Sequence, residues 1–231
     1  MLELARMTEL NKKASLGLVE LVVVMAALTF LPAWTLDYWQ AWILLAVFFA
    51  CTLLIDLYLV KNDPKLLERR LKAGPGSEQE KSQKIIQAMA MVAFVAIFVL
   101  SALDHRFGWS PVPPYVSVIG DVLVALGLYF VFLVFKENTF TSAIIEIDDD
   151  QKVISSGPYA LVRHPMYIGA LVMLIGVPLA LGSLWGLVAI IPMTIVLIAR
   201  LLDEEKFLAK NLAGYGEYQS KVKYHLLPLI W

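Results

Sequence analysis

Six long apolar runs constrain this chain more than any other feature of its sequence. They cover residues 16–33, 41–60, 85–103, 116–135, 166–181 and 184–202. A helix needs about 20 apolar residues to cross a hydrocarbon layer about 30 Å thick, and the last two runs are near the short limit. Hydrophobic residues make up 59% of the chain and charged residues 17%, whereas a soluble domain is about 25% charged. The sequence therefore predicts an all-α, multi-pass transmembrane helical bundle of about six spans.

The positions of the lysines and arginines predict the orientation of the spans in the membrane. If six helices cross the membrane, the loops on one side carry a single basic residue, Arg106, and the other 18 of the 19 lie on the side of the two termini. Basic residues favour the cytosolic side. We therefore predict a multi-pass integral protein of the bacterial inner membrane with both termini cytosolic. The first run lacks a clear small-x-small cleavage site, so we interpret it as a retained span. The net charge of −1 gives no indication of a nucleic-acid partner.

Several polar features outside the C-terminal part have simple structural interpretations. Residues 65–72 ("KLLERRLK") have helical spacing and suit a short interfacial helix. Residues 77–84 form a polar run that we expect to be a solvated connector. Glu20, Asp56 and Asp121 lie within about two turns of a predicted span boundary, where a charge is tolerated. Whether Glu20 or Asp56 lines a substrate cavity stays open.

The segment "GPYALVRHPMYIG" at residues 157–169 departs from this pattern, because charged and titratable groups stand directly before an apolar run. Pro165 suits the first turn of a helix, which places His164 at or beside the helix cap. A helix over 165–181, a tight turn at Gly182-Ser183 and a return helix over 184–202 have nearly equal lengths. The two ends of this hairpin therefore meet at one membrane face. The side chains expected to converge there are Arg163, His164, Tyr167, Arg200, Asp203, Glu204 and Glu205.

This charged cluster predicts a functional site at the cytosolic interface. Three acidic residues in a row at the expected end of a helix oppose the helix dipole, so helix propensity does not explain them. The cluster has too few His and Cys residues for a structural zinc site, and the chain contains no P-loop. A pocket with both signs of charge suits a zwitterionic cofactor from the cytosol and an apolar substrate from the bilayer. A carboxylate binds an ammonium group or ribose hydroxyls, and an arginine binds a carboxylate. Methyl transfer from a sulfonium needs mainly such positioning.

Three motifs together resemble the isoprenylcysteine carboxyl methyltransferase family, which is grouped with the membrane phospholipid methyltransferases. They are "GPYALVRHPMYIG", "RLLDEEKFL" at 200–208 and "YGEYQSKVKYHLLP" at 215–228, and the resemblance covers roughly residues 138–228. It implies that S-adenosyl-L-methionine binds in a cytosol-facing pocket made by the C-terminal hairpin and the C-terminal segment. It also implies two parts, N-terminal transmembrane helices over 1–135 and a cofactor-binding methyltransferase core over 136–231.

The resemblance implies a role for individual residues of these motifs. Arg200, one helical turn before Glu204, is expected to face the substrate as a catalytic and substrate-binding residue, and Arg163 is a second substrate-binding candidate. No metal site is expected. The expected cofactor-binding residues are Gln151, Lys152, Val153, Ile154, Tyr159, His164, Pro165, Met166, Tyr167, Glu204 and Glu205.

The resemblance implies an integral membrane methyltransferase that acts on a lipophilic acceptor and is surrounded by membrane lipids. A prenylcysteine-like carboxylate, a lipid amine, an isoprenoid and a thiol all stay open as acceptors, as does the oligomeric state. An NADPH-dependent sterol-type reductase is the alternative, since such proteins share the arginine-histidine-proline segment. They usually carry Asn-Tyr after the proline and lack the double glutamate. A transporter or scaffold is disfavoured, because the charges gather at the mouth of the hairpin and not near the membrane midplane.

Overall fold

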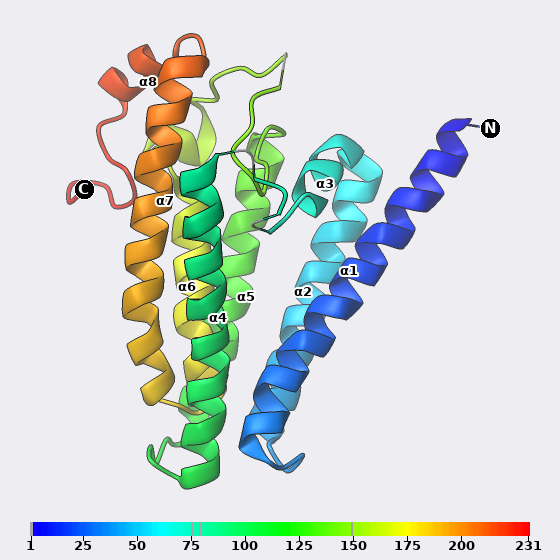
Figure 1. The fold of residues 1–231 in the computed structure, drawn as a ribbon, viewed down its shortest axis with the longest axis vertical. Helices are drawn as coiled ribbons and strands as arrows, with labels where there is room; N and C mark the ends of the chain where they lie inside the picture. Colours follow the sequence, from blue (N-terminus) through cyan, green and yellow to red (C-terminus); the bar gives the residue numbers. More distant parts are fainter. Residues whose placement is uncertain (1, 75, 79, 149) are drawn as a thin grey trace.

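The computed structural model describes residues 2–74, 76–78, 80–148 and 150–231, with side chains described from residue 8 onward. All regular structure in these ranges is helical, which confirms the all-α prediction. Long helices lie side by side along the molecule, and the short helices α3 and α8 lie at one end (Figure 1). The elements are α1 (Leu2–Ala33), α2 (Trp39–Asn62), α3 (Pro64–Leu71), α4 (Lys81–Phe107), α5 (Pro114–Glu137), η1 (Gly157–Ala160), α6 (Pro165–Ala180), η2 (Trp185–Ala189), α7 (Ile190–Asn211) and α8 (Tyr215–Lys221).

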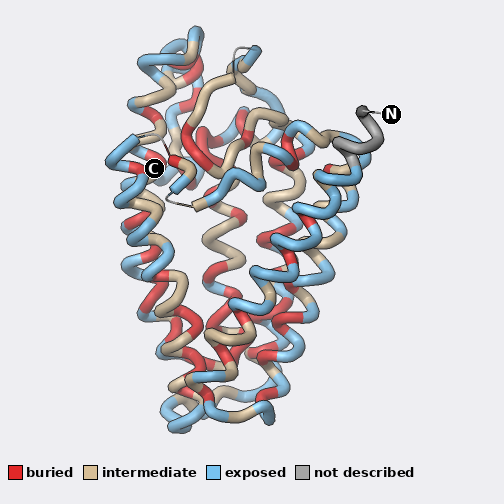
Figure 2. The backbone as a smooth tube through the Cα atoms, turned by 45° about the vertical axis from the view of Figure 1, so that its right-hand side comes forward, coloured by how far each residue is buried: buried red, intermediate tan, exposed pale blue. Residues whose placement is uncertain are grey.

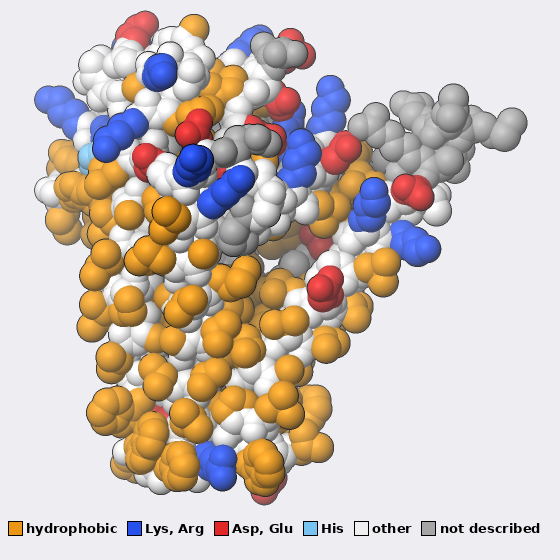
Figure 3. Space-filling view, viewed as in Figure 1, with side chains coloured by type: hydrophobic (Ala, Val, Ile, Leu, Met, Phe, Trp, Pro, Cys, Tyr) orange, Lys and Arg blue, Asp and Glu red, His pale blue; other side chains and the backbone are white. Residues whose placement is uncertain are grey.

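Five stretches of the described chain are long and apolar enough to cross a membrane. They are Thr8–Ala33, Trp39–Asn62, Lys81–Phe107, Pro114–Glu137 and Trp185–Asn211. The sixth predicted span is α6, whose 16 residues make a helix about 24 Å long. Figure 3 shows hydrophobic side chains over most of the length of the bundle, with lysines and arginines concentrated at the end that holds α3 and α8. These features confirm a multi-pass helical bundle.

The turns at the two ends of the bundle are of different lengths. One end carries only the α1–α2, α4–α5 and α6–η2 turns, while the start of α1, α3, the segment between α5 and α6, α8 and the C-terminal segment lie at the other (Figure 1). The predicted turn at Gly182 is present, with φ of +67°, and the N–H of Ser183 donates to Pro178 O at 2.8 Å. The hairpin therefore returns the chain to the end where the predicted site residues lie.

The return helix differs from the prediction at both of its ends. A 3₁₀ turn, η2, precedes α7, and α7 continues to Asn211 and not to residue 202. Asp203, Glu204 and Glu205 therefore lie two turns inside the helix, where their carboxylates do not face its unpaired carbonyl groups. The prediction that these residues end the helix was wrong; Asp203 instead accepts hydrogen bonds from Ser82 and Gln83 of α4.

Helices α5 and α6 pack through glycines that face each other across the interface. A Cβ on Gly127 would lie 2.5 Å from the backbone nitrogen of Met173 and 2.6 Å from the carbonyl oxygen of Gly169. A Cβ on Gly176 would lie 2.7 Å from the carbonyl oxygen of Gly120. Small residues at such positions allow close approach of helix backbones in membranes. Burial is accordingly concentrated between the helices, while their outward faces are exposed (Figure 2).

The predicted interfacial helix is present as α3, but the connector that follows it is not solvated throughout. Asp63 caps α3 by accepting a hydrogen bond from the N–H of Leu66 at 3.0 Å. Glu78 and Gln83, both expected to be solvated, are buried with exposed fractions of 2% and 0%. The prediction was wrong for these two residues because each bonds to Arg200 of α7.

We expect Gly127→Ala to destabilise the protein by about 1–3 kcal/mol, because the added methyl meets backbone atoms that rotamer changes cannot move. Thermal unfolding of the detergent-solubilised protein measures this effect. Gly216→Ala is the matched control, since nothing lies within 4 Å of its Cβ position. An equal melting temperature for the two variants would contradict the close α5–α6 contact.

Candidate functional site

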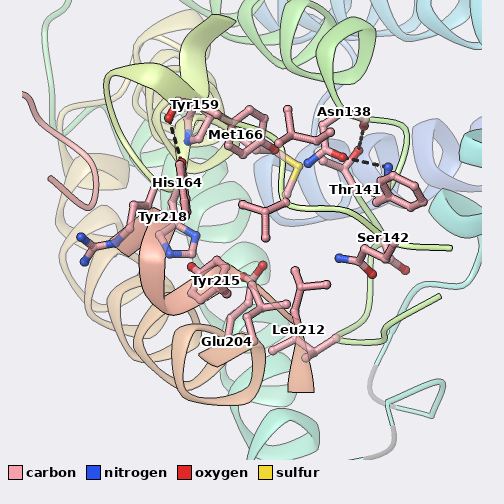
Figure 4. Close-up of a pocket in the computed structure, with 18 of the residues that line it drawn as sticks. Asn138, Thr141, Ser142, Tyr159, His164, Met166, Glu204, Leu212, Tyr215 and Tyr218 are labelled. Carbon is pink, nitrogen blue, oxygen red and sulfur yellow. Dashed lines mark hydrogen bonds between the residues drawn. The ribbon is translucent and has the colours of Figure 1, made fainter. Parts of the chain in front are cut away.

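A pocket lies at the end of the bundle that holds α3 and α8. Its wall is formed by the segment between α5 and α6, the start of α6, the last turns of α7, and α8 (Figure 4). All the predicted site residues except Arg200 and Glu205 line this pocket. Those that do are Gln151, Lys152, Val153, Ile154, Tyr159, Arg163, His164, Pro165, Met166, Tyr167 and Glu204. The hairpin thus brings together residues more than forty positions apart in sequence.

Glu205 takes part in a buried cluster of charges beside the pocket. Arg163 Nε donates to Glu205 Oε1 at 2.6 Å, and Arg163 Nη2 donates to Oε2 at 3.2 Å. His164 Nε2 lies 3.0 Å from Oε1, and Gln219 Nε2 donates to Oε2 at 3.4 Å. The exposed fraction of Glu205 is 7%. This carboxylate therefore joins the start of α6 to α7 and α8, and it does not line the pocket.

The C-terminal segment closes this cluster on its other side. The N–H groups of Arg163 and His164 donate to the carbonyls of Tyr224 and His225, at 2.9 and 3.0 Å. His225 Nδ1 lies 3.1 Å from Glu205 Oε1, and both ring nitrogens lie 2.9 Å from Arg163 Nη2. Burial lowers the pKa of His225, which favours the neutral ring at pH 7. A neutral ring can donate from Nδ1 to Glu205 and accept from Arg163 at Nε2.

Arg200 is not among the pocket-lining residues, and it is held by two side chains of the N-terminal part and by a carbonyl of the segment after α5. Its Nη1 donates to Glu78 Oε1 at 2.9 Å and to Gln83 Oε1 at 3.0 Å, and its Nη2 donates to Ala143 O at 2.9 Å. The expected position one turn before Glu204 is observed. In this structure its charge is paired with Glu78, and a role toward substrate remains a prediction.

Glu204 is the carboxylate of α7 that faces the pocket. Tyr167 Oη donates to Glu204 Oε2 at 2.8 Å. Oε1 makes no hydrogen bond to any other residue that the structure describes, in contrast to the several partners of Glu205. Of the two adjacent glutamates, Glu205 therefore stabilises the fold, whereas Glu204 has a carboxylate oxygen that can accept a further hydrogen bond.

Three tyrosines form much of the pocket wall toward α8. Tyr218 Oη donates to Tyr159 O at 2.8 Å, and burial raises the pKa of Tyr218 to about 12. Tyr215 is also buried, but its hydroxyl has no hydrogen-bond partner among the described residues. Burial raises the pKa of Tyr215 well above its usual range, so this hydroxyl stays protonated. An unpaired buried donor costs about 1–3 kcal/mol, which is unusual unless a ligand satisfies it.

The segment after α5 has little regular structure and is held by side chains of the N-terminal part. Arg69 Nη1 donates to Thr139 O at 2.8 Å and its guanidinium pairs with Asp148. Glu78 Oε2 accepts from the N–H of Ile145 at 3.2 Å. Residues of this segment that line the pocket are Asn138, Phe140, Thr141, Ser142, Ile144, Ile145 and Glu146. The sequence did not predict these residues as part of the site. They lie in a loop whose position depends on contacts with other elements, and such a loop has no periodic pattern.

Comparison with known proteins identifies the segment that contains this pocket. The phospholipid methyltransferase family model matches residues 115–214. This segment is similar to the phospholipid methyltransferase family. Its match begins at the start of α5, so the family unit includes the α5–α6 glycine contact.

Two curated relatives from rice extend the comparison. They come from Oryza sativa subsp. indica and japonica and are named "probable protein-S-isoprenylcysteine O-methyltransferase". Each is 31% identical over 113 residues, which cover 47% of this chain and 59% of the relative. The chain therefore spans less than two thirds of the length of these relatives. The family resemblance predicted from the sequence motifs is confirmed.

The remaining charged residues singled out from sequence lie away from the pocket. Glu20 is exposed, and neither it nor Asp56 lines the pocket beside Glu204. Tyr215 and Tyr218, which do line it, belong to the "YGEYQSKVKYHLLP" motif, but no role was predicted for them. The sequence feature that could have indicated them is the pair of tyrosines three positions apart, shortly after the predicted end of the return helix.

We expect Glu205→Gln to lower the free energy of unfolding by on the order of 3 kcal/mol, because it leaves the buried Arg163 without an opposite charge. Glu204→Gln should have a smaller effect on stability, since Tyr167 is its only described partner. Glu217→Gln is the matched control, because Glu217 is exposed and pairs only with Lys221 in the same helix. Chemical unfolding in detergent compares the three. Equal stability of all three variants would show that the cluster contributes nothing to the fold.

Proposed function

We propose that this protein is an integral membrane methyltransferase that uses S-adenosyl-L-methionine to methylate a lipophilic acceptor. The observation that carries the proposal is the pocket at the mouth of the α6–α7 hairpin, most of whose lining residues lie in the segment that the phospholipid methyltransferase family model matches. The names of the rice relatives support an oxygen acceptor. The double glutamate on α7 and the Met166-Tyr167 pair favour methyl transfer over a sterol-type reductase that uses NADPH.

The residues of the pocket fit a zwitterionic cofactor with several polar groups. Glu204 Oε1, in the pocket wall, accepts no hydrogen bond from the residues that the structure describes, which suits an ammonium group. The Tyr215 hydroxyl is a buried donor without a partner, which suits an acceptor atom of a bound molecule. When bound, S-adenosyl-L-methionine supplies a methyl group on a sulfonium that is already activated for transfer.

The chain's own contribution is positioning and exclusion of water. Glu204 is held by Tyr167, and Tyr159 is held by Tyr218, so both sides of the pocket are fixed by hydrogen bonds before any ligand binds. Prepositioned groups reduce the entropy that a reaction must lose, and this accounts for much of the rate in transfer reactions. In this proposal the backbone of Gln151–Ile154 and the side chains of His164, Pro165 and Met166 also contact the cofactor. The margin of the pocket carries the charged side chains of Arg200, Arg163 and Glu205, and in this proposal the two arginines face the acceptor.

The distribution of basic residues supports a cytosolic pocket. Arg106 is the basic residue at the end with short turns, while the pocket lies at the opposite end. By the positive-inside rule that end faces the cytosol, in our proposal at a bacterial inner membrane. A water-soluble cofactor then enters from the cytosol and a lipophilic acceptor from the surrounding lipids.

Ligand-dependent melting of the detergent-solubilised protein tests the proposal. A ligand that binds only the folded state raises the melting temperature. We expect S-adenosylhomocysteine to raise it and NADPH to leave it unchanged, and we expect labelled methyl from S-adenosyl-L-methionine to appear in a fractionated lipid extract. Stabilisation by NADPH alone would favour the reductase. No effect of either ligand would refute a cofactor pocket.

We expect Tyr215→Phe to weaken S-adenosylhomocysteine binding about two- to tenfold, the loss of one hydrogen bond of about 0.5–1.5 kcal/mol. The ligand-free protein should be as stable as the wild type or more stable, because a buried donor without a partner has been removed. Calorimetry measures the affinity and thermal unfolding measures the stability.

The matched control is Tyr218→Phe, which removes a hydroxyl that already donates to Tyr159 O. This variant should lose stability, by about 1 kcal/mol. Unchanged affinity for S-adenosylhomocysteine in Tyr215→Phe would show that the unpaired hydroxyl does not serve the ligand.

A further inference from the structure

Three arginines lie in or beside the pocket, and they differ in what neutralises them. Arg163 pairs with Glu205 at 2.6 Å, and Arg200 pairs with Glu78 at 2.9 Å. Among the residues that the structure describes, no carboxylate lies within ion-pair distance of Arg70. Arg70 belongs to α3, which sequence analysis assigned only to the membrane interface.

The contacts of Arg70 are all with neutral groups. Its Nη1 donates to Ser142 O at 3.0 Å and lies 3.8 Å from Met166 Sδ. Its Cζ lies 5.1 Å from the ring centroid of Phe135. Burial, with a smaller effect of the nearby positive charge of Arg200, lowers the pKa of Arg70 to about 10, so the guanidinium stays charged at pH 7. Arg70 is only partly buried, but a partly desolvated charge without an opposite charge still has a cost, and an anion that binds beside it relieves that cost.

We propose that Arg70 binds the negatively charged group of the methyl acceptor and so makes the protein specific for acidic acceptors. This inference rests on the proposed function. Arg70 is then a substrate-binding residue supplied by the N-terminal part of the chain, outside the segment that the family model matches. A planar guanidinium is suited to a carboxylate, since it donates two parallel hydrogen bonds.

The position of Arg70 favours the acceptor over the cofactor as its ligand. Met166 and Glu204 lie on opposite sides of the pocket (Figure 4), and Arg70 contacts Met166. The carboxylate that suits an ammonium ion therefore lies across the pocket from the side chain that Arg70 contacts. Next to Arg70 in α3, Leu66 and Leu67 pack in an apolar cluster with Phe135 and Ile55.

That cluster connects Arg70 to the apolar, membrane-embedded part of the molecule. Ile55 also lines a groove between α2 and α5 whose other lining residues are Cys51, Leu54, Ala125, Leu128, Tyr129 and Phe132. An amphiphilic acceptor has its charged end at such a boundary between apolar and polar surroundings. Met166, which lines the pocket, is the pocket residue that Arg70 contacts, and an unbranched thioether side chain can change rotamer at small cost.

Binding of an acid and its amide to the full-length protein saturated with S-adenosylhomocysteine tests this inference. The probes are N-acetyl-S-farnesylcysteine, which carries one carboxylate, and its carboxamide, which carries none. The variants are Arg70→Gln, which keeps a donor for Ser142 O, Arg70→Lys, and the control Lys65→Gln on the exposed side of the same helix. Calorimetry gives the affinity for each probe and for S-adenosylhomocysteine.

We expect the wild type and Lys65→Gln to bind the acid at least tenfold more tightly than the amide. Arg70→Gln should bind both probes about equally and should keep its affinity for S-adenosylhomocysteine within threefold. Arg70→Lys should lose at least threefold of the preference, because an ammonium group lacks the planar pair of donors. If Arg70→Gln does not fold, this loss in Arg70→Lys decides the question.

The other outcomes separate the two proposals. An unchanged preference in the Arg70 variants, or a loss of S-adenosylhomocysteine affinity equal to the loss of acid affinity, overturns the role of Arg70 alone. A wild type that binds the acid and the amide equally also overturns it. A wild type that does not bind S-adenosylhomocysteine refutes the proposed function itself.

Discussion

The buried carboxylate of Glu205 is the interaction on which the rest of the site depends. It receives hydrogen bonds from Arg163 at the start of α6 and from Gln219 of α8, and it contacts His225 of the C-terminal segment. These groups come from three separate parts of the chain. An ion pair this deeply buried is stable only when its remaining hydrogen bonds are also satisfied. The cluster therefore fixes how the end of the hairpin and the C-terminal segment meet, and their meeting forms the pocket.

The α5–α6 contact fixes the position of this cluster along the axis of the bundle. Because glycines face each other at Gly120, Gly127, Gly169 and Gly176, the two helix backbones approach closely along their length. Helix α6 has only 16 residues, so a small change in its position along α5 would move its first residue, Pro165, away from α7. A contact made by backbone atoms allows little sliding. Close packing deep in the bundle thus positions His164 and Tyr167 at its end.

The N-terminal part of the chain also builds the site, although the family match begins at residue 115. Glu78 and Arg69 hold the segment that follows α5, and Glu78 at the same time pairs with Arg200 of α7. The pocket wall is therefore supported from outside the matched segment. In the proposed function the pocket binds the cofactor, and Arg70 of α3, outside the matched segment, binds the acceptor.

The sequence by itself determined the all-α class, the apolar runs, the helix start at Pro165 and the convergence of the two hairpin ends, because each follows from local composition or from helix length. Only the tertiary structure decided between Glu204 and Glu205. Adjacent helical residues point about 100° apart, so one carboxylate faces the pocket and the other faces Arg163. The burial of Glu78 and Gln83, the neutral surroundings of Arg70 and the unpaired hydroxyl of Tyr215 were likewise beyond the sequence. Each depends on contacts between residues far apart in the chain, which no local pattern encodes.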